Sequence, residues 1–386
     1  MSYIENLLKG AEVEWTTIGD ATFVEIANSG RKPVKSDLRI AGEIPYYGAN
    51  NIQDYVEGFT HNGDYILIAE DGTASIENYS IQYAVGKFWA NNHVHVIRGK
   101  NKLNSRFLYH YLQIVNFIPF LSGGGRAKLT KGKLLDIPIP IPPSEVQKEI
   151  VRILDTFTAL TAELTAELTA RKKQYEYYRG KLLNFNDSNS KCECLSIREL
   201  CEFTNGKGHE KDIVDYGNYI VVNSKFISTD SKVAKYSNKQ ISPLFIDDVL
   251  IVMSDLPNGR ALAKTFLVDK NDRYTLNQRI GRISVKDKRV LLPKFLNYNL
   301  NRTSQLTKFD NGADQTNLRK DQILDVKIPV PPIEEQERIV AILDKFDTLT
   351  NSISEGLPKE IELRQKQYEY YREQLLTFPE PSKSDY

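Results

Sequence analysis

The hydrophobic positions of one segment occur twice along the chain with the spacing of a helix. In residues 144–185 the apolar positions mostly alternate in steps of three and four, and residues 333–378 repeat this pattern. Such spacing is typical of a coiled-coil seam. Each seam follows a Pro-Pro pair, which suits the start of a helix and cannot continue a strand. We therefore predict two long helices that pack against each other as an antiparallel intramolecular coiled coil.

The two seams differ in their middle. The first carries TAELTAEL at residues 161–168, and the matching stretch of the second is longer by four residues, about one helical turn. Extra steps of four are stutters, which locally unwind a supercoil. We therefore expect one long helix in each copy.

The regions before the two seams are rich in glycine, asparagine, tyrosine and β-branched residues. Runs such as 65–68 and 94–97 have the composition of short strands and are bounded by turn signals. The two regions align weakly at first and closely at their ends, where residues 123–143 parallel residues 312–332. We predict an α+β fold with pseudo-twofold symmetry, in which the long helices separate two similar domains of many short strands. The expected domain, helix, domain, and helix with tail span residues 1–143, 144–185, 186–332 and 333–386.

The composition excludes several classes of protein. Of the 386 residues 41% are hydrophobic and 26% are charged, as in ordinary globular proteins. No apolar run reaches the roughly 18 residues of a membrane helix, and the start of the chain lacks the apolar core of a signal peptide. Three cysteines form no even disulfide framework, so we expect reduced thiols and a cytoplasmic location.

The basic residues are clustered, although the net charge is only +1. A free-standing nucleic-acid-binding domain is usually clearly basic, so the total charge alone argues against one. Residues 98–133 nevertheless contain basic residues and no acidic ones, and basic residues outnumber acidic ones from 273 to 327. Each half of the chain therefore has one basic end.

No constellation in the sequence carries catalytic or metal-binding chemistry. The histidines have no metal-ligand spacing, and the stretch from Gly123 to Lys128 lacks the spacing of a phosphate-binding loop. The Pro-Pro pairs precede Ser144 and Ile333, so neither places an aromatic ring over a flipped base as an adenine methyltransferase does. We assign no catalytic residue, no metal and no bound cofactor.

Polar side chains change at particular places within a frame that the two domains share. In the last loop Leu129 matches Leu318, whereas Arg126 stands opposite Gln315. Arginine and lysine suit guanine, asparagine and glutamine suit adenine, and glycine lets the backbone approach a phosphate closely. The alternative is that these stretches are ordinary solvated loops. The candidate DNA-binding residues are Asn91, Asn92, His93, Gly124, Gly125, Arg126, Lys128 and Lys131 in the first domain and Asn277, Gln278, Arg279, Gln315, Asn317 and Arg319 in the second.

The repeated order of domain and long helix, with IPxPP at each helix start and KQYEYYR near each helix end, resembles the specificity subunit of type I restriction–modification systems. The TAEL tandem resembles the spacer repeat of the type IC branch. The resemblance covers essentially the whole chain. It implies that each domain is a target recognition domain for one half of an asymmetric site in double-stranded DNA.

The resemblance also implies partners for this chain. Two methyltransferase subunits would dock on the helical frame, and restriction subunits would join them to form the nuclease. S-adenosylmethionine, ATP and Mg would then be bound by those partners, and this chain would catalyse no reaction. The candidate contacts for the methyltransferase subunits are Gln147, Tyr177, Gln336 and Tyr370, of which the two tyrosines point off the seams.

Two other functions remain open at this point. A DNA-binding regulator with two reading heads would need a more basic chain and appreciable DNA binding on its own. A coiled-coil scaffold without DNA binding would have no reason to vary the polar side chains inside a preserved loop frame.

The TAEL repeat predicts a testable spacing. Two domains on one side of a duplex should lie about one helical turn apart, roughly 10 base pairs between half-site centres. Half-sites of about three to four base pairs then leave an unread gap of about six or seven. One further TAEL adds about 6 Å of helix, against about 3.4 Å per base pair, before tilt and unwinding reduce it. We expect a gap longer by about one base pair and unchanged half-sites; methylome sequencing that finds the gap unaltered would contradict this.

Overall fold

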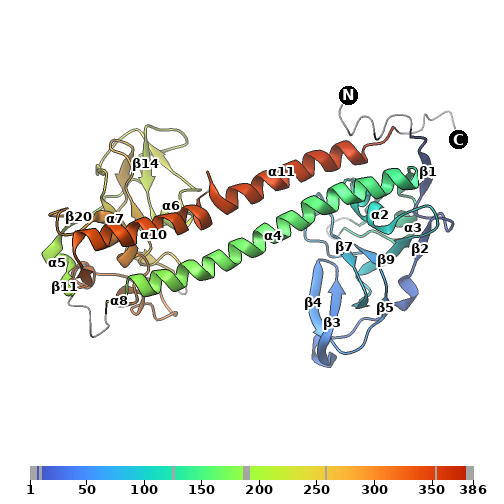
Figure 1. Cartoon of the computed structure of the whole chain (residues 1–386), viewed down its shortest axis with the longest axis horizontal. Helices are drawn as coiled ribbons and strands as arrows, with labels where there is room; N and C mark the ends of the chain where they lie inside the picture. Colours follow the sequence, from blue (N-terminus) through green and yellow to red (C-terminus); the bar gives the residue numbers. More distant parts are fainter. Residues whose placement is uncertain are drawn as a thin grey trace. The chain divides into compact units, whose positions relative to one another are not determined.

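The chain folds into two compact units in the computed structural model (Figure 1). Unit 1 comprises Met1–Glu167 and Lys359–Tyr386, and unit 2 comprises Leu168–Pro358. Helix α4 (Ser144–Leu182) runs from unit 1 into unit 2, so each unit contains one part of it. The structure describes residues 7, 11–123, 127–185, 192–256, 259–352 and 354–379.

Unit 1 holds two four-stranded sheets and a two-stranded ribbon. The first sheet is antiparallel and has the order β2 (Val24–Ile26), β9 (Val94–Gly99), β6 (Tyr65–Ala69), β7 (Ile81–Ala84). The second has the order β4 (Asn51–Val56), β3 (Ala41–Gly48), β8 (Lys87–Ala90), β5 (His61–Asn62), with β3 and β8 parallel. The ribbon pairs β1 (Glu14–Thr17) with β10 (Pro138–Ile141). Strand β6 is buried along its whole length, which explains why its sequence is a continuous apolar run rather than an alternating one.

The helices of unit 1 and its first sheet together form the main buried core of the unit. These helices are α2 (Ser105–Leu112), α3 (Lys131–Leu135), the first part of α4, and α11 (Gly356–Leu376), with short 3-10 turns η1 (Asn28–Gly30), η2 (Ser36–Leu38) and η3 (Ile118–Phe120). Helix α2 begins where the side chain of Asn104 accepts hydrogen bonds from the backbone of Arg106 and Phe107. Its apolar face packs with Ile150 and Leu154 of α4 in one buried cluster.

Unit 2 repeats this plan. Its first sheet has the order β12 (Cys201–Asn205), β20 (Ile280–Val285), β16 (Val249–Val252), β18 (Thr265–Leu267). Its second has the order β13 (Ile213–Val214), β15 (Tyr236–Ser237), β14 (Tyr219–Val222), β19 (Tyr274–Leu276), again with one parallel pair, β14 and β19. Its ribbons are β11 (Glu193–Ser196) with β22 (Lys327–Val330), and β17 (Ser254–Asp255) with β21 (Thr316–Asn317). Its helices are α5 (Ile197–Leu200), α6 (Ser224–Ser228), α7 (Pro293–Leu300), α8 (Ser304–Thr307), α9 (Lys320–Leu324) and α10 (Ile333–Asn351), beside the last part of α4. The predicted α+β class with two similar domains is confirmed.

Each unit contains an antiparallel pair of the long helices (Figure 1). In unit 1 Phe157 of α4 stacks on Tyr371 of α11, with ring centroids 5.3 Å apart. In unit 2 Phe346 of α10 contacts Tyr175 and Tyr178 of α4, at 6.1 and 5.7 Å. These aromatic pairs occupy seam positions, so the apolar spacing identified the packed faces of the helices.

The second copy of the long segment is not one helix. Helix α10 ends at Asn351 and α11 begins at Gly356, so the prediction of a single helix is wrong for this copy. Gly356 has φ +76°, which other residues adopt only with strain, and a Cβ there would lie 2.4 Å from the Thr348 carbonyl oxygen. The hydroxyl of Ser352 accepts hydrogen bonds from the backbone of Ser354 and Glu355. The four extra residues therefore leave the helix as a turn instead of extending it as a stutter.

A buried glutamine ties each domain to its long helix. The Gln147 Oε1 atom accepts a hydrogen bond from Asn104 N, and its Nε2 donates to the carbonyl oxygens of Lys102 and Pro142, all at 2.8 Å. Gln336 makes the equivalent bonds in unit 2, to Leu292 N and to two carbonyl oxygens, at 2.8 to 2.9 Å. The two glutamines are 1% and 0% exposed. Their burial disagrees with the prediction that these side chains contact a partner subunit.

An aspartate about two turns further along each helix makes a second contact with the domain. Asp155 accepts from Arg106 Nε at 2.9 Å and from His110 Nε2 at 2.8 Å. Asp344, the matching residue of the second copy, accepts from Lys294 at 2.7 Å and from the Tyr298 hydroxyl at 2.6 Å. The contacts of the two units are therefore duplicated although the donors differ.

The break between α10 and α11 predicts opposite effects for two glycines. Gly356→Ala should lower the free energy of unfolding by about 1 to 3 kcal/mol, because alanine is strained at positive φ and meets the Thr348 carbonyl. Gly180→Ala in α4 is the matched control and should stabilise by up to about 1 kcal/mol, since its Cβ would meet no atom within 4 Å. Urea denaturation measures both; destabilisation of equal size by the two variants would contradict the account.

The buried histidine of unit 1 predicts a dependence of stability on pH. Burial lowers the pKa of His110 despite the opposing effect of Asp155, so the folded chain resists a proton that the unfolded chain accepts near the ordinary value of 6.5. The stability present above that pH is therefore lost as the pH falls below it. His110→Tyr, which copies the Tyr298 and Asp344 pair of unit 2, should remove this dependence. As the pH is lowered from about 7.5 to about 5.5, the Tm of this variant should rise relative to the Tm of the parent chain. A Tm difference that stays constant over this range would refute the assignment.

Candidate nucleic-acid interface

Three stretches of unit 1 meet just beyond the end of β6. The backbone N–H of Glu70 donates to the carbonyl of His93, and the N–H of Leu129 donates to the carbonyl of Glu70, both at 2.8 Å. Asp71 forms a β-bridge with Lys128. Residues 91–93 and the last loop, which are far apart in the sequence, thus lie on either side of Glu70 and Asp71.

Unit 2 has the same arrangement beyond the end of β16. The N–H of Met253 donates to the carbonyl of Arg279 at 3.1 Å, and the N–H of Leu318 donates to the carbonyl of Met253 at 2.7 Å. Ser254 pairs with Asn317 across the β17 and β21 ribbon. Several of the residues that were predicted to read DNA, among them His93, Lys128, Arg279 and Asn317, therefore lie around one strand end in each unit.

Carboxylates stand behind the exposed side chains of the unit 1 cluster. Glu70 accepts from Arg31 at 2.7 Å and pairs with Lys128 at 3.2 Å. Burial raises the pKa of Glu70. The hydrogen bonds from Arg31 and Lys128 and the charge interaction with His95 outweigh burial and hold the pKa below its usual value. Asp71 lies 2.5 Å from the Nδ1 atom of His93. The imidazole of His93 and the ammonium group of Lys128 therefore lie at the surface of the cluster, each paired with a carboxylate behind it.

The cluster of unit 2 combines neutral polar side chains with exposed arginines. The amide Nε2 of Gln315 donates to the buried hydroxyl of Ser254 at 2.6 Å. Gln278 donates to Glu210 at 2.7 Å, at the exposed edge of the same cluster. The side chains exposed beside them are Arg279, Asn317 and Arg319.

The remaining predicted DNA-binding residues have different positions. Asn91 is buried, and its Oδ1 accepts from the backbone N–H of His93 at 2.8 Å, so its side chain shapes the turn and does not reach the surface as predicted. Asn92 and Lys131 are exposed. Asn277 is partly buried and forms a β-bridge with Lys207. Gly124, Gly125 and Arg126 lie outside the described residues.

Sequence reasoning missed the residues at the centre of the two clusters, Glu70, Asp71 and Ser254. Each of these residues follows an apolar strand closely, and that position was the available signal. Their importance depends on backbone pairing between distant segments, which the strand pattern alone does not reveal.

The tyrosines predicted to point away from the seams do so. Tyr177 and Tyr370 are 64% and 60% exposed, and each ring meets the edge of the following tyrosine, Tyr178 or Tyr371. Their contact with another subunit stays a prediction.

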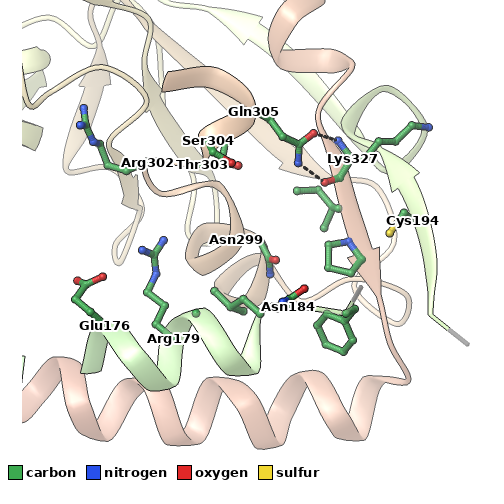
Figure 2. Close-up of a pocket in the computed structure, with 15 residues that line it drawn as sticks. Glu176, Arg179, Asn184, Cys194, Asn299, Arg302, Thr303, Ser304, Gln305 and Lys327 are labelled. Carbon is green, nitrogen blue, oxygen red and sulfur yellow. Dashed lines mark hydrogen bonds between the residues drawn. The ribbon is translucent and has the colours of Figure 1, made fainter. Parts of the chain in front are cut away.

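A cavity of about 490 Å³ in unit 2 lies beside the end of α4 and is lined by polar residues (Figure 2). Arg179 donates to the carbonyl oxygens of Tyr298 and Asn301 at 2.9 and 2.6 Å. Both side-chain bonds of Gln305 go to the backbone of Lys327, as the dashed lines in Figure 2 indicate. Arg179 therefore holds α4 to the domain, and Gln305 holds α8 to β22. Because both side chains bind protein backbone, we assign the cavity no ligand.

The described residues include no group of three or more metal-ligating side chains close enough to hold an ion. The three cysteines are free thiols. Among the helices of the described part of the chain, none has the length and apolar character needed to cross a membrane.

Comparison with known proteins identifies the class to which this fold and these clusters belong. Residues 12–171 and 189–363 each match the type I restriction modification DNA specificity domain. The chain belongs to the family of type I restriction–modification specificity subunits, as the resemblance implied. It is a DNA sequence-specificity subunit, and the catalytic activities of such systems reside in partner subunits.

Individual relatives cover nearly the whole chain. A putative type I restriction enzyme specificity subunit of Haemophilus influenzae is 50% identical over 98% of both chains. The specificity subunit of a type I restriction enzyme of Escherichia coli is 34% identical over 99% of this chain and 98% of its own. The crystal structure of the S subunit of a type I restriction–modification system from M. genitalium matches with a TM-score of 0.64 at 15% identity, over 99% of this chain and all of that one. That structural likeness supports the fold.

Proposed function

We propose that this chain reads an asymmetric, two-part DNA site, with unit 1 reading one half and unit 2 the other. The observation that carries the proposal is the pair of equivalent clusters with different exposed side chains. Unit 1 presents His93 and Lys128, whereas unit 2 presents Arg279, Gln315 and Asn317. Lysine and arginine suit guanine, and asparagine and glutamine suit adenine, so the two clusters favour different base sequences.

The charge distribution supports base reading more than phosphate binding. Lys128 is paired with Glu70, so this basic group of unit 1 is held in a fixed position and its charge is offset. Nonspecific affinity for DNA depends on unpaired positive charge near phosphates. We infer that most phosphate contacts come from partner subunits and that the chain alone binds DNA weakly.

The proposed partners are two methyltransferase subunits and the restriction subunits that join them. The exposed rings of Tyr177 and Tyr370 occur once in each copy of the long segment, which supports one methyltransferase subunit for each copy. S-adenosylmethionine, ATP and Mg are then bound by these partners, and this chain holds no catalytic cofactor of its own. The complex acts on DNA in the cytoplasm, in keeping with the free thiols of the chain.

The continuous helix α4 supports the proposed role of the TAEL repeat. Residues 161–168 lie within α4 without interruption, so an inserted TAEL would add helix rather than loop. We retain a gap of about six or seven unread base pairs, from the geometry of reading heads one helical turn apart.

The rival functions are less well supported. A free-standing regulator would need a more basic chain, whereas the net charge of this one is only +1. A scaffold without DNA binding would not account for family membership along both halves of the chain.

Single-molecule methylome sequencing tests the proposal. A methylation-free host would carry this gene with its methyltransferase partner, and a matched host would carry the methyltransferase alone. We expect a two-part motif with adenine methylation only when this chain is present, with unequal halves separated by about six or seven base pairs. Absence of any motif, with the methyltransferase folded and cofactor-bound, would contradict the proposal.

A further inference from the structure

Asp71 and Ser254 occupy the same place in the two units. Asp71 is bridged to Lys128, and Ser254 is paired in the same way with Asn317. Their side chains are 21% and 7% exposed, so both lie behind the surface of the cluster. Each nevertheless binds a more exposed side chain, because Asp71 contacts His93 and Ser254 contacts Gln315.

The contact with Asp71 determines which nitrogen of His93 carries a hydrogen. An ionised carboxylate only accepts hydrogen bonds, so the Nδ1 atom of His93, 2.5 Å away, must be the donor. In the neutral ring the Nε2 atom is then left as an acceptor. An acceptor in the major groove pairs with the amino group of adenine or cytosine and not with the carbonyl of guanine or thymine.

Among the residues that the structure describes, Asp71 forms an ion pair with His93, whereas the nearby arginine and lysine pair with Glu70. Glu70 takes the two nearest basic groups, Arg31 at 2.7 Å and Lys128 at 3.2 Å. The two adjacent carboxylates therefore have separate tasks. Glu70 holds the cations in place, and Asp71 holds the imidazole.

The contact with Ser254 acts on Gln315 in a comparable way. One hydrogen of the Gln315 amide is donated to the Ser254 hydroxyl at 2.6 Å, which fixes the plane of the amide. Its second hydrogen and its Oε1 atom stay available as a donor and acceptor pair, the pattern that matches adenine N7 and N6. The neighbouring Asp255 does not disturb this contact, because its carboxylate accepts from the backbone of Ala261 and Leu262.

We propose that Asp71 and Ser254 are positioning residues that set the hydrogen-bonding face which His93 and Gln315 present to a base. This inference rests on the proposed function, because it assumes that the two clusters read DNA. It makes the second residue after the end of β6 and of β16 a determinant of specificity that touches no base itself. Unit 1 and unit 2 then use the same backbone position with different chemistry.

The test compares the methylation motifs of Asp71→Asn and Ser254→Ala with that of the parent chain, each expressed with the methyltransferase partner. The amide of Asp71→Asn can donate as well as accept, so the tautomer of His93 is no longer fixed. We expect the preference at one base pair of the unit 1 half-site to fall by about tenfold, with the other half-site and the gap unchanged. Ser254→Ala should relax one position of the opposite half-site only, so each variant is the matched control for the other.

The parent chain separates failure of this inference from failure of the proposed function. A parent that gives no motif overturns the proposed function, whereas a parent motif that both variants reproduce unchanged overturns only the positioning role. A variant that loses methylation altogether would be purified with the methyltransferase and titrated by fluorescence anisotropy against duplexes with each of the four base pairs at every position of its half-site. Equal weakening on all duplexes would overturn the inference, and weakening confined to the parent base pair at one position would support it.

Discussion

The buried amides of Gln147 and Gln336 hold each recognition domain to its long helix, and the position of the reading cluster depends on this connection. Each amide satisfies a backbone N–H and two backbone carbonyl groups, in hydrogen bonds that are buried or partly buried. A buried polar group without a partner costs roughly 1 to 3 kcal/mol, so rotation of the domain on the helix would be opposed by several such penalties. The aspartate ties at Asp155 and Asp344 oppose the same motion.

This constraint separates two groups of residues. One group holds each domain on its long helix, and the other forms the exposed surface that is proposed to read DNA bases. The frame is duplicated closely, because the glutamine, the aspartate and the strand-end hydrogen bonds occur in both units. The exposed side chains of the clusters differ in charge and in hydrogen-bonding pattern. The matched specificity domains of the two halves therefore share a frame and differ in the side chains that the frame exposes.

The sequence predicted the features that local patterns determine. Steps of three and four identified α4 and the packed faces of both long segments, and the comparison of the two domains located 91–93 and the last loop. The break before Gly356 was missed because it depends on a positive φ and on an approach to the Thr348 carbonyl. Gln147 was predicted to contact a partner subunit, whereas its side chain is buried because it binds a distant loop of its own domain. Asp71 and Ser254 were missed because pairing between remote strands gives them their role.

The most direct test of the central claim is the methylation motif of a chain whose second domain is replaced by the first. The ribbons give natural joints, because Glu14 pairs with Ile141 and Glu193 pairs with Val330, so residues 14–141 can replace residues 193–330. If each unit recognises one half-site through its own cluster, the motif should contain two identical half-sites, both equal to the half-site read by unit 1. A motif that keeps the second half-site of the parent chain would contradict the account.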